Sequence, residues 1–222
     1  MAETETRTLA VATGNAHKRS ELEAMLAPLG VTVVLARDHG LGEVVEDGDT
    51  FAANALKKAR EGYEVTGFPC LADDSGLEVD ALGGAPGVIS ARWAGPGQDD
   101  AANNDKLVRE LAGVPPERRG ARFVSSLALV VPAALAEHAG DGPWAREELA
   151  DLGAVAFSVE GTVPGRMLDA PRGGAGFGYD PYFLYEPAGK TFAELSQDEK
   201  LGFSHRGRAM RALDALLRQL FG

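Results

Sequence analysis

Hydrophobic and polar residues follow two different periods in the first part of the chain. Residues 8–12 form a short apolar, β-prone run, and residues 31–35 form a second run that is rich in β-branched side chains. Between them, Leu22, Leu26 and Leu29 recur at helical spacing on one face, and Gly30 stands where a helix commonly ends. The chain therefore opens as strand, glycine-containing turn, helix and strand, which is typical of an α/β protein.

The pattern predicts further elements along the rest of the chain. Small or apolar side chains repeat every four residues over 51–61, which indicates a helix that Gly62 ends, with Lys57, Lys58 and Arg60 on its outer faces. A short apolar run at 70–72 stops at two aspartates. The other expected segments are a mostly irregular stretch at 76–97, a helix at 103–111, strands at 123–131 and 154–163, and an amphipathic helix from Ser204 onward. Residues 132–153 are expected to form a long surface connection with at most one or two helical turns.

Composition and charge narrow the classes of function. The 222 residues, of which 45% are hydrophobic and 25% charged, predict a single globular domain over residues 1–222. A net charge of −11 argues against binding nucleic acid through a basic surface. The lone Cys70 excludes an internal disulfide and is expected to be a small buried hydrophobe. The polar N-terminus lacks a signal core and no segment suits a membrane span, so we expect no membrane partner and a cytoplasmic location.

A candidate anion-binding turn lies between the first strand and the first helix. Its residues are Thr13-Gly14-Asn15-Ala16-His17-Lys18. A helix N-terminus offers unpaired backbone N–H groups and a favourable dipole to an anion, and Lys18 adds an ammonium group one turn later. The turn is neither a Walker A loop nor a dinucleotide fingerprint, so an ordinary strand-to-helix turn is the alternative.

Acidic residues form two further candidates. Asp73 and Asp74 follow an apolar run, and adjacent residues of a strand point to opposite faces, so one carboxylate can face a ligand while the other supports the backbone. Such a carboxylate could bind Mg²⁺ or accept a proton from water. Glu46, in an acidic turn before the helix at 51, is a possible second ligand. The alternatives are a solvated turn and a helix cap.

The last candidates could recognise a planar base. Glycines flank Phe177 in the segment 173–181, so that the ring is free to stack and Asp180 could accept a base N–H. Lys200 and Arg206 are donor-only side chains, suited to reading carbonyl oxygens, and Ser204 is a natural N-cap. The alternatives are a loop whose aromatic packs on the core and a solvated helix end.

Taken in their order along the chain, these motifs resemble the inosine triphosphate pyrophosphatase family, also called XTP/dITP diphosphatases. The resemblance runs from about Leu9 to the C-terminal helix. It implies an α/β fold with an elongated mixed β-sheet, flanking helices and two lobes around a central cleft, and a homodimer. It also implies Mg²⁺-dependent hydrolysis of dITP, ITP and XTP to the monophosphate and pyrophosphate.

The resemblance also implies a role for each matching residue. The triphosphate would be held by Thr13, Gly14, Asn15, Ala16, His17 and Lys18. Asp74 would accept a proton and bind Mg²⁺ together with Glu46, and Ser75 would contact substrate. For Asp73, we expect structural support or a secondary contact. The base would be bound by Phe177, Gly178, Tyr179 and Asp180, and its edge read by Lys200, His205 and Arg206.

One departure from the family pattern leaves rival functions open. The family commonly has Glu where this chain has Ala53. A non-catalytic nucleotide sensor on the same fold is therefore an alternative. The paired aspartates also suggest a phosphomonoesterase or phosphotransferase with an aspartate nucleophile, although the usual Asp-x-Asp spacing is missing. A pyrophosphatase for pyrimidine or modified nucleotides is a third alternative.

Overall fold

The computed structural model describes residues 7–222, so the polar segment 1–6 lies outside the described residues. Within the described part the strands are hydrogen-bonded in the order β2-β1-β3-β4-β6-β7-β8, with β5 beside β6. The strands are β1 Thr8–Ala12, β2 Thr32–Leu35, β3 Cys70–Val79, β4 Gly120–Pro132, β5 Ala145–Leu149, β6 Ala154–Met167, β7 Phe183–Tyr185 and β8 Lys190–Thr191. The α-helices are α1 Ala16–Leu26, α2 Phe51–Thr66, α3 Asp100–Glu110, α4 Ala133–Ala136, α5 Gln197–Phe203 and α6 His205–Phe221.

The sheet is mixed and open, with helices on its faces, as the sequence predicts. β1 pairs in parallel with β2 and β3, whereas β6 pairs antiparallel with β5 and β7. The described residues divide into two compact units. Unit 1 comprises the chain up to Asp74, Ser126–Glu160 and Ala209–Gly222, and unit 2 comprises Ser75–Ser125 and Gly161–Arg208. In residues 7–222, no helix is both long and apolar enough to cross a membrane.

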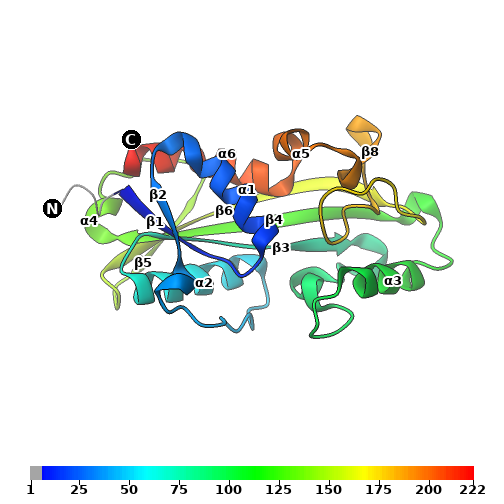
Figure 1. Cartoon of the computed structure of the whole chain (residues 1–222), viewed down its shortest axis with the longest axis horizontal. Helices are drawn as coiled ribbons and strands as arrows, with labels where there is room; N and C mark the ends of the chain where they lie inside the picture. Colours follow the sequence, from blue (N-terminus) through cyan, green and yellow to red (C-terminus); the bar gives the residue numbers. More distant parts are fainter. Residues whose placement is uncertain (1–6) are drawn as a thin grey trace. The chain divides into compact units, whose positions relative to one another are not determined.

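Unit 1 buries the two faces of its parallel strands against different helices. Leu9, Val11 and Leu71 share a core with α1 and the C-terminal part of α6. The residues in between are small, as at Ala10 and Ala12, and share a second core with α2. This alternation is the period of two expected of a strand. Figure 1 shows α1 and the end of α6 on one side of these strands and α2 on the other.

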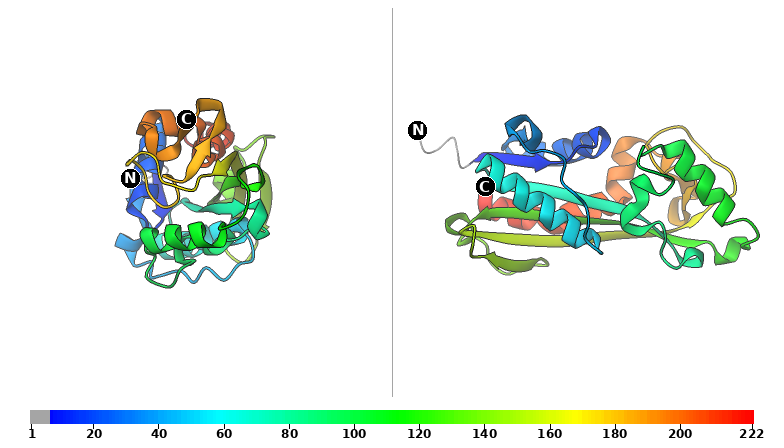
Figure 2. Two further views of the ribbon diagram at one scale, coloured as in Figure 1. Left: turned by 90° about the vertical axis from the view of Figure 1, so that its right-hand side faces the viewer. Right: turned by 90° about the horizontal axis from the view of Figure 1, so that it is seen from below.

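The second helix is longer than the sequence predicts. We expected Gly62 to end it, but α2 continues to Thr66 and ends at Gly67, which has a left-handed φ of 68°. Gly62 is instead a packing residue, because a Cβ there would lie 2.4 Å from Cys70 Sγ. Cys70 itself is fully buried, as predicted, and burial raises the pKa of its thiol to about 12. Figure 2 shows α2 lying along the unit 1 strands.

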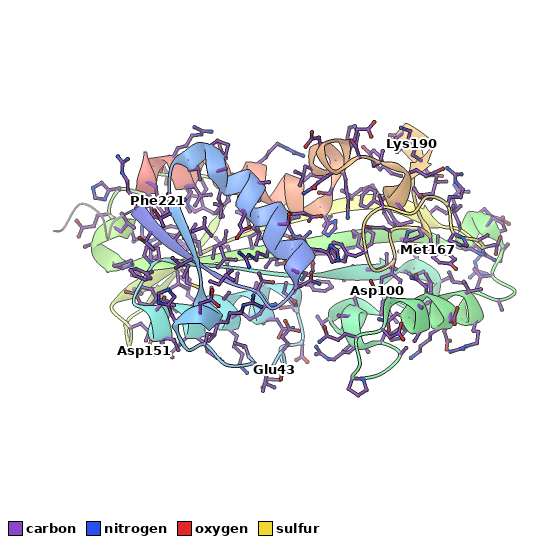
Figure 3. The ribbon with its side chains drawn as sticks, viewed as in Figure 1. Glu43, Asp100, Asp151, Met167, Lys190 and Phe221 are labelled. Carbon is purple, nitrogen blue, oxygen red and sulfur yellow. The ribbon has the colours of Figure 1, made fainter. Side chains whose placement is uncertain are left out.

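Unit 2 has an aromatic core. Phe123 of β4 lies 4.6 Å from Phe183 and 5.6 Å from Phe192 between ring centroids. β7 follows a glycine-rich loop and pairs with the end of β6, where Met167 is opposite Phe183. Figure 3 shows Met167 at the end of this strand. The aromatic core thus supports the loop that precedes β7.

Two further predictions are wrong. β3 does not stop at the two aspartates but continues to Val79, so less of the stretch 76–97 is irregular. The segment 132–153 is not only a surface connection, because it contains the strand β5. Its four-residue helix α4 is within the one or two helical turns that the sequence allows. β5 escaped prediction because its first four residues are exposed and polar or small, and only the ladder with β6 defines it. The amphipathic helix predicted from Ser204 is confirmed as α6.

Candidate active site

The turn between β1 and α1 is fixed by its own side chains. The Asn15 backbone N–H donates to Thr13 Oγ1 at 3.2 Å. Asn15 Oδ1 then accepts from the backbone N–H groups of His17 at 2.9 Å and Lys18 at 3.1 Å, which makes Asn15 the N-cap of α1. Gly14 is exposed and has nothing within 4 Å of the place that a Cβ would occupy. The turn is therefore a preformed helix start with room beside its backbone.

The two adjacent aspartates point to opposite sides of β3. Asp73 forms an ion pair with Lys18 of α1 at 2.8 Å, and its side chain is fully buried. Asp74 forms an ion pair with Lys58 of α2 at 3.0 Å. Because α1 and α2 cover different faces of the strands, the prediction that the pair divides between two faces is confirmed. Each buried carboxylate therefore has its own lysine.

Lys58 brings Glu46 and Asp74 to one point. Its ammonium donates to Glu46 Oε1 at 2.6 Å and to Asp74 Oδ1 at 3.0 Å. The Lys58 side chain is only 11% exposed, so the prediction that it lies on an outer face is wrong. The preceding residue, Lys57, does face outward and pairs with Asp47. The Lys58 ammonium thus joins the loop before α2 to β3.

Asn54 reinforces the same connection. It is fully buried on α2, and its Oδ1 accepts from the Gly48 backbone N–H at 2.8 Å. Its Nδ2 donates to Asp74 Oδ2 at 3.3 Å. Neither Asn54 nor Lys58 is among the site residues that the sequence predicts. Their spacing of four residues, which places both on one helical face, was the available signal.

Burial and charge set the protonation of this cluster. Burial raises the pKa of Asp74, while the ammonium groups of Lys58 and Lys18 act in the opposite direction. Burial alone would lower the pKa of Lys58, but the carboxylates of Asp74 and Glu46 outweigh it and raise that pKa. Lys58 is therefore a permanent cation. Asp74 is a stronger base than an exposed aspartate, which suits a proton acceptor.

In unit 2, Lys200 is fixed beside the aromatic loop. Its ammonium donates to Asp180 Oδ2 at 2.6 Å in a pair whose side chains are 7% and 3% exposed. The same carboxylate oxygen accepts the Phe177 backbone N–H at 2.9 Å. The Lys200 ammonium also lies 4.8 Å from the centroid of the Phe177 ring. Asp180, which we expected to bind a base, thus joins Lys200 to the loop that carries Phe177.

Helix α3 holds the next residue of this loop. The Gly178 backbone N–H donates to Asp100 Oδ2 at 2.7 Å, and Asn104 Nδ2 donates to the Gly178 carbonyl at 2.9 Å. Figure 3 shows Asp100 at the start of α3. Tyr179 is buried, and its hydroxyl donates to the Ser90 carbonyl at 2.8 Å. The loop is therefore anchored at Phe177 and at the two residues that follow it, and its partners Asp100 and Asn104 are not among the predicted site residues.

The start of α6 is buried rather than solvated. Ser204 Oγ accepts the Gly207 backbone N–H at 3.0 Å, which confirms the predicted N-cap. His205 is 5% exposed and stacks on Phe123 at 4.8 Å between centroids. Arg206 is 1% exposed, and its Nη2 donates to Ser75 Oγ at 2.9 Å. Such buried polar side chains are unusual at a helix end. The hydrogen bond between Arg206 and Ser75 joins two residues that the sequence predicts in the site.

Comparison with known proteins gives consistent relatives. The model of the Ham1 family matches residues 9–216. A dITP/XTP pyrophosphatase of Syntrophobacter fumaroxidans is 50% identical over 96% of this chain and 84% of its own length. One of Nocardia farcinica is 47% identical over 91% of each chain.

Solved structures agree with these sequence relatives. A HAM1 protein from Coxiella burnetii superposes with a TM-score of 0.79 and 34% identity, over 95% of this chain and 98% of its own. A nucleoside-triphosphatase, or dITP/XTP pyrophosphatase, from Mycobacterium abscessus gives 0.70 and 42% over the same shares.

Proposed function

The chain belongs to the Ham1 family, and on that basis we propose that it hydrolyses non-canonical purine nucleoside triphosphates. The substrates would be dITP, ITP and XTP, and the products the nucleoside monophosphate and pyrophosphate. One observation carries the proposal: the carboxylates of Glu46 and Asp74 converge on a single cation, the ammonium of Lys58. A point where two carboxylates meet a positive charge suits the chemistry of a metal–triphosphate complex.

These residues fit a Mg²⁺ ion. Magnesium prefers oxygen ligands and usually takes only one or two carboxylates, with waters and substrate phosphates completing its shell. Glu46 and Asp74 supply that number, and no group of three or more His, Cys, Asp or Glu side chains that could hold a metal occurs in residues 7–222. When bound, the ion would neutralise charge on the phosphate oxygens.

The chain's own residues would then perform the remaining chemistry. In the proposed step, water attacks the α-phosphorus, and the bond from that phosphorus to the α–β bridging oxygen breaks, so that the oxygen leaves with pyrophosphate. Asp74 would accept the proton of that water, and the Thr13–Lys18 turn would hold the phosphate oxygens. Asn54 would keep Asp74 oriented through its contact at 3.3 Å.

The unit 2 residues would recognise the base. Phe177 would stack on it, while Lys200, His205 and Arg206 would read its edge, with Ser75 contacting substrate. Hypoxanthine and xanthine carry a carbonyl at C6, where adenine carries an amino group. Donor-only Lys and Arg side chains can hydrogen-bond the carbonyl but leave the amino group of adenine unpaired. A lost hydrogen bond of this kind can discriminate strongly between the two kinds of base.

A substrate panel with identified products tests the activity. We expect pyrophosphate from dITP, ITP and XTP with Mg²⁺, and little from ATP or GTP. Equal rates on all purine triphosphates would refute the specificity, and orthophosphate as the product would refute the reaction. Asp74→Asn should abolish turnover while the far-UV spectrum stays unchanged. The matched variant Asp73→Asn should retain more activity, because Asp73 lies on the other face of β3 and pairs with Lys18.

The panel also separates the alternatives. A nucleotide sensor, suggested by Ala53, would bind ITP in calorimetry without forming product. A homodimer and a cytoplasmic location are part of the proposal, and light scattering on the purified chain tests the first.

A further inference from the structure

Lys58 occupies the position that the proposed function gives to a metal ion. Its ammonium lies 2.6 Å from Glu46 Oε1 and 3.0 Å from Asp74 Oδ1. Mg²⁺ binds carboxylate oxygens at about 2.0–2.1 Å. An ion that contacts these same two oxygens would meet the ammonium directly, so the two cations cannot both bind Glu46 Oε1 and Asp74 Oδ1.

The surrounding charges make this competition severe. The cluster contains two ammonium groups and three carboxylates, which leaves a net charge of −1; its members are Lys18, Lys58, Glu46, Asp73 and Asp74. Lys18 is engaged with Asp73 on the other face of β3. A free divalent cation would therefore approach a site whose negative charge Lys58 already largely neutralises.

We propose that Lys58 is an internal counter-ion that keeps free Mg²⁺ from Glu46 and Asp74 until a nucleotide brings the metal with it. The proposal rests on the proposed function. A triphosphate adds several negative charges, which favour the metal and offer the displaced ammonium a new partner. Lys58 is thus a positioning residue that sets the order of binding: little metal binds alone, and metal and nucleotide bind together.

Direct metal binding tests this order. Mn²⁺ replaces Mg²⁺ as a probe with the same preference for oxygen, and its free concentration is measured by electron paramagnetic resonance without nucleotide. Lys58→Met should tighten Mn²⁺ binding about tenfold or more, because the ion no longer displaces an ammonium from both carboxylates. The matched control is Lys57→Met, which removes the same charge one residue away but breaks only the exposed pair with Asp47.

The Lys57→Met control separates a specific effect of Lys58 from a general effect of net charge on Mn²⁺ binding. Equal tightening in Lys57→Met and Lys58→Met would show a general effect of net charge and overturn the proposal. Unchanged Mn²⁺ affinity in a folded Lys58→Met variant would also overturn it. Near-ultraviolet circular dichroism establishes that the variant is folded.

A second measurement uses the unaltered protein and so does not depend on a variant's stability. The ammonium of Lys58 can be followed by ¹⁵N-detected or ¹H–¹⁵N NMR. Mg²⁺ alone, at millimolar concentration, should leave its signal in place, and Mg²⁺ with a non-hydrolysable dITP analogue should shift or broaden it. A shift of the same size with Mg²⁺ alone would refute the ordered binding.

Failure of the two proposals can be distinguished. Absence of dITP hydrolysis in the unaltered protein would overturn the proposed function, yet the Mn²⁺ comparison would remain readable. Conversely, normal dITP hydrolysis with equal Mn²⁺ affinity in all three proteins would overturn only the role of Lys58.

Discussion

Replacing Gly62 with alanine tests how closely α2 packs on the strands of unit 1. A Cβ at this position would lie 2.4 Å from Cys70 Sγ, 3.2 Å from Ala12 Cβ and 3.6 Å from Ala36 Cβ. Ordinary contact begins at 3.4 Å, so the approach to the sulfur is 1.0 Å too short. Because the sulfur is fully buried between the helix and the strand, α2 or β3 has to move.

Two opposing effects set the magnitude. Overpacking a well-packed core costs about 1–3 kcal/mol. Alanine in a helix interior is more favourable than glycine by about 1 kcal/mol. Gly62→Ala should therefore lower the free energy of unfolding by about 0–2 kcal/mol, which corresponds to a decrease in melting temperature of up to roughly 8 °C for a chain of this size.

The cysteine separates the two effects. In a Cys70→Ala background the sulfur is gone and the nearest remaining atom is Ala12 Cβ at 3.2 Å. Gly62→Ala should then be neutral or stabilising by up to about 1 kcal/mol, as helix propensity alone predicts. The coupling energy between the two sites should be about 1–3 kcal/mol, equal to the overpacking cost.

Urea unfolding followed by far-ultraviolet circular dichroism measures the free energy of unfolding of four proteins: the unaltered chain, Gly62→Ala, Cys70→Ala and the double variant. Gly202→Ala on α5 is the matched control, because nothing lies within 4 Å of its Cβ position and the substitution should stabilise or leave the protein unchanged. An equal effect of Gly62→Ala in both backgrounds would refute the close contact with the sulfur.

Two further substitutions test the anchoring of the unit 2 loop. Asp180→Asn keeps an acceptor but removes the charge beside Lys200, and since breaking a buried pair costs about 3–5 kcal/mol, the melting temperature should fall clearly in differential scanning fluorimetry. An unchanged melting temperature would contradict a role for this pair in stability. Asn104→Ala removes the donor to the Gly178 carbonyl, worth about 1 kcal/mol, so KM for dITP should rise roughly fivefold with kcat little changed. The exposed neighbour Asp105→Ala should leave KM unchanged, and equal effects of the two variants would argue against this anchor.

Much of the fold could be predicted from the sequence because its hydrophobic periods are local. Leu22 and Leu26 of α1 are fully buried, and so are Leu213 and Leu216 of α6, as their helical spacing predicts. The end of β3 could not be found this way. Adjacent aspartates ordinarily end a strand, since an unpaired buried carboxylate is costly. Here each has a lysine from another helix, which is a tertiary contact that no local pattern contains.

The types of residue in the candidate site could be predicted from the sequence, but the side chains that each residue contacts could not. The carboxylates of Glu46 and Asp74 predict a metal site from residue type alone, and both contact Lys58 in the structure. Lys58 was placed on an outer face because a lysine beside an apolar stripe is usually solvated. Its burial depends on two carboxylates that lie 12 and 16 residues away in the sequence. Only the folded chain shows that this charge is compensated.

The geometry of β3 finally decides which carboxylates can share one cation. Side chains of adjacent strand residues point to opposite faces, so Asp73 and Asp74 direct their carboxylates toward different cations. The two lysines agree with this separation, because Lys18 forms its ion pair with Asp73 at 2.8 Å and Lys58 forms its ion pair with Asp74 at 3.0 Å. A second carboxylate for a cation at Asp74 must therefore come from another segment. Glu46 meets that need, and Asn54 holds its loop in place through Gly48.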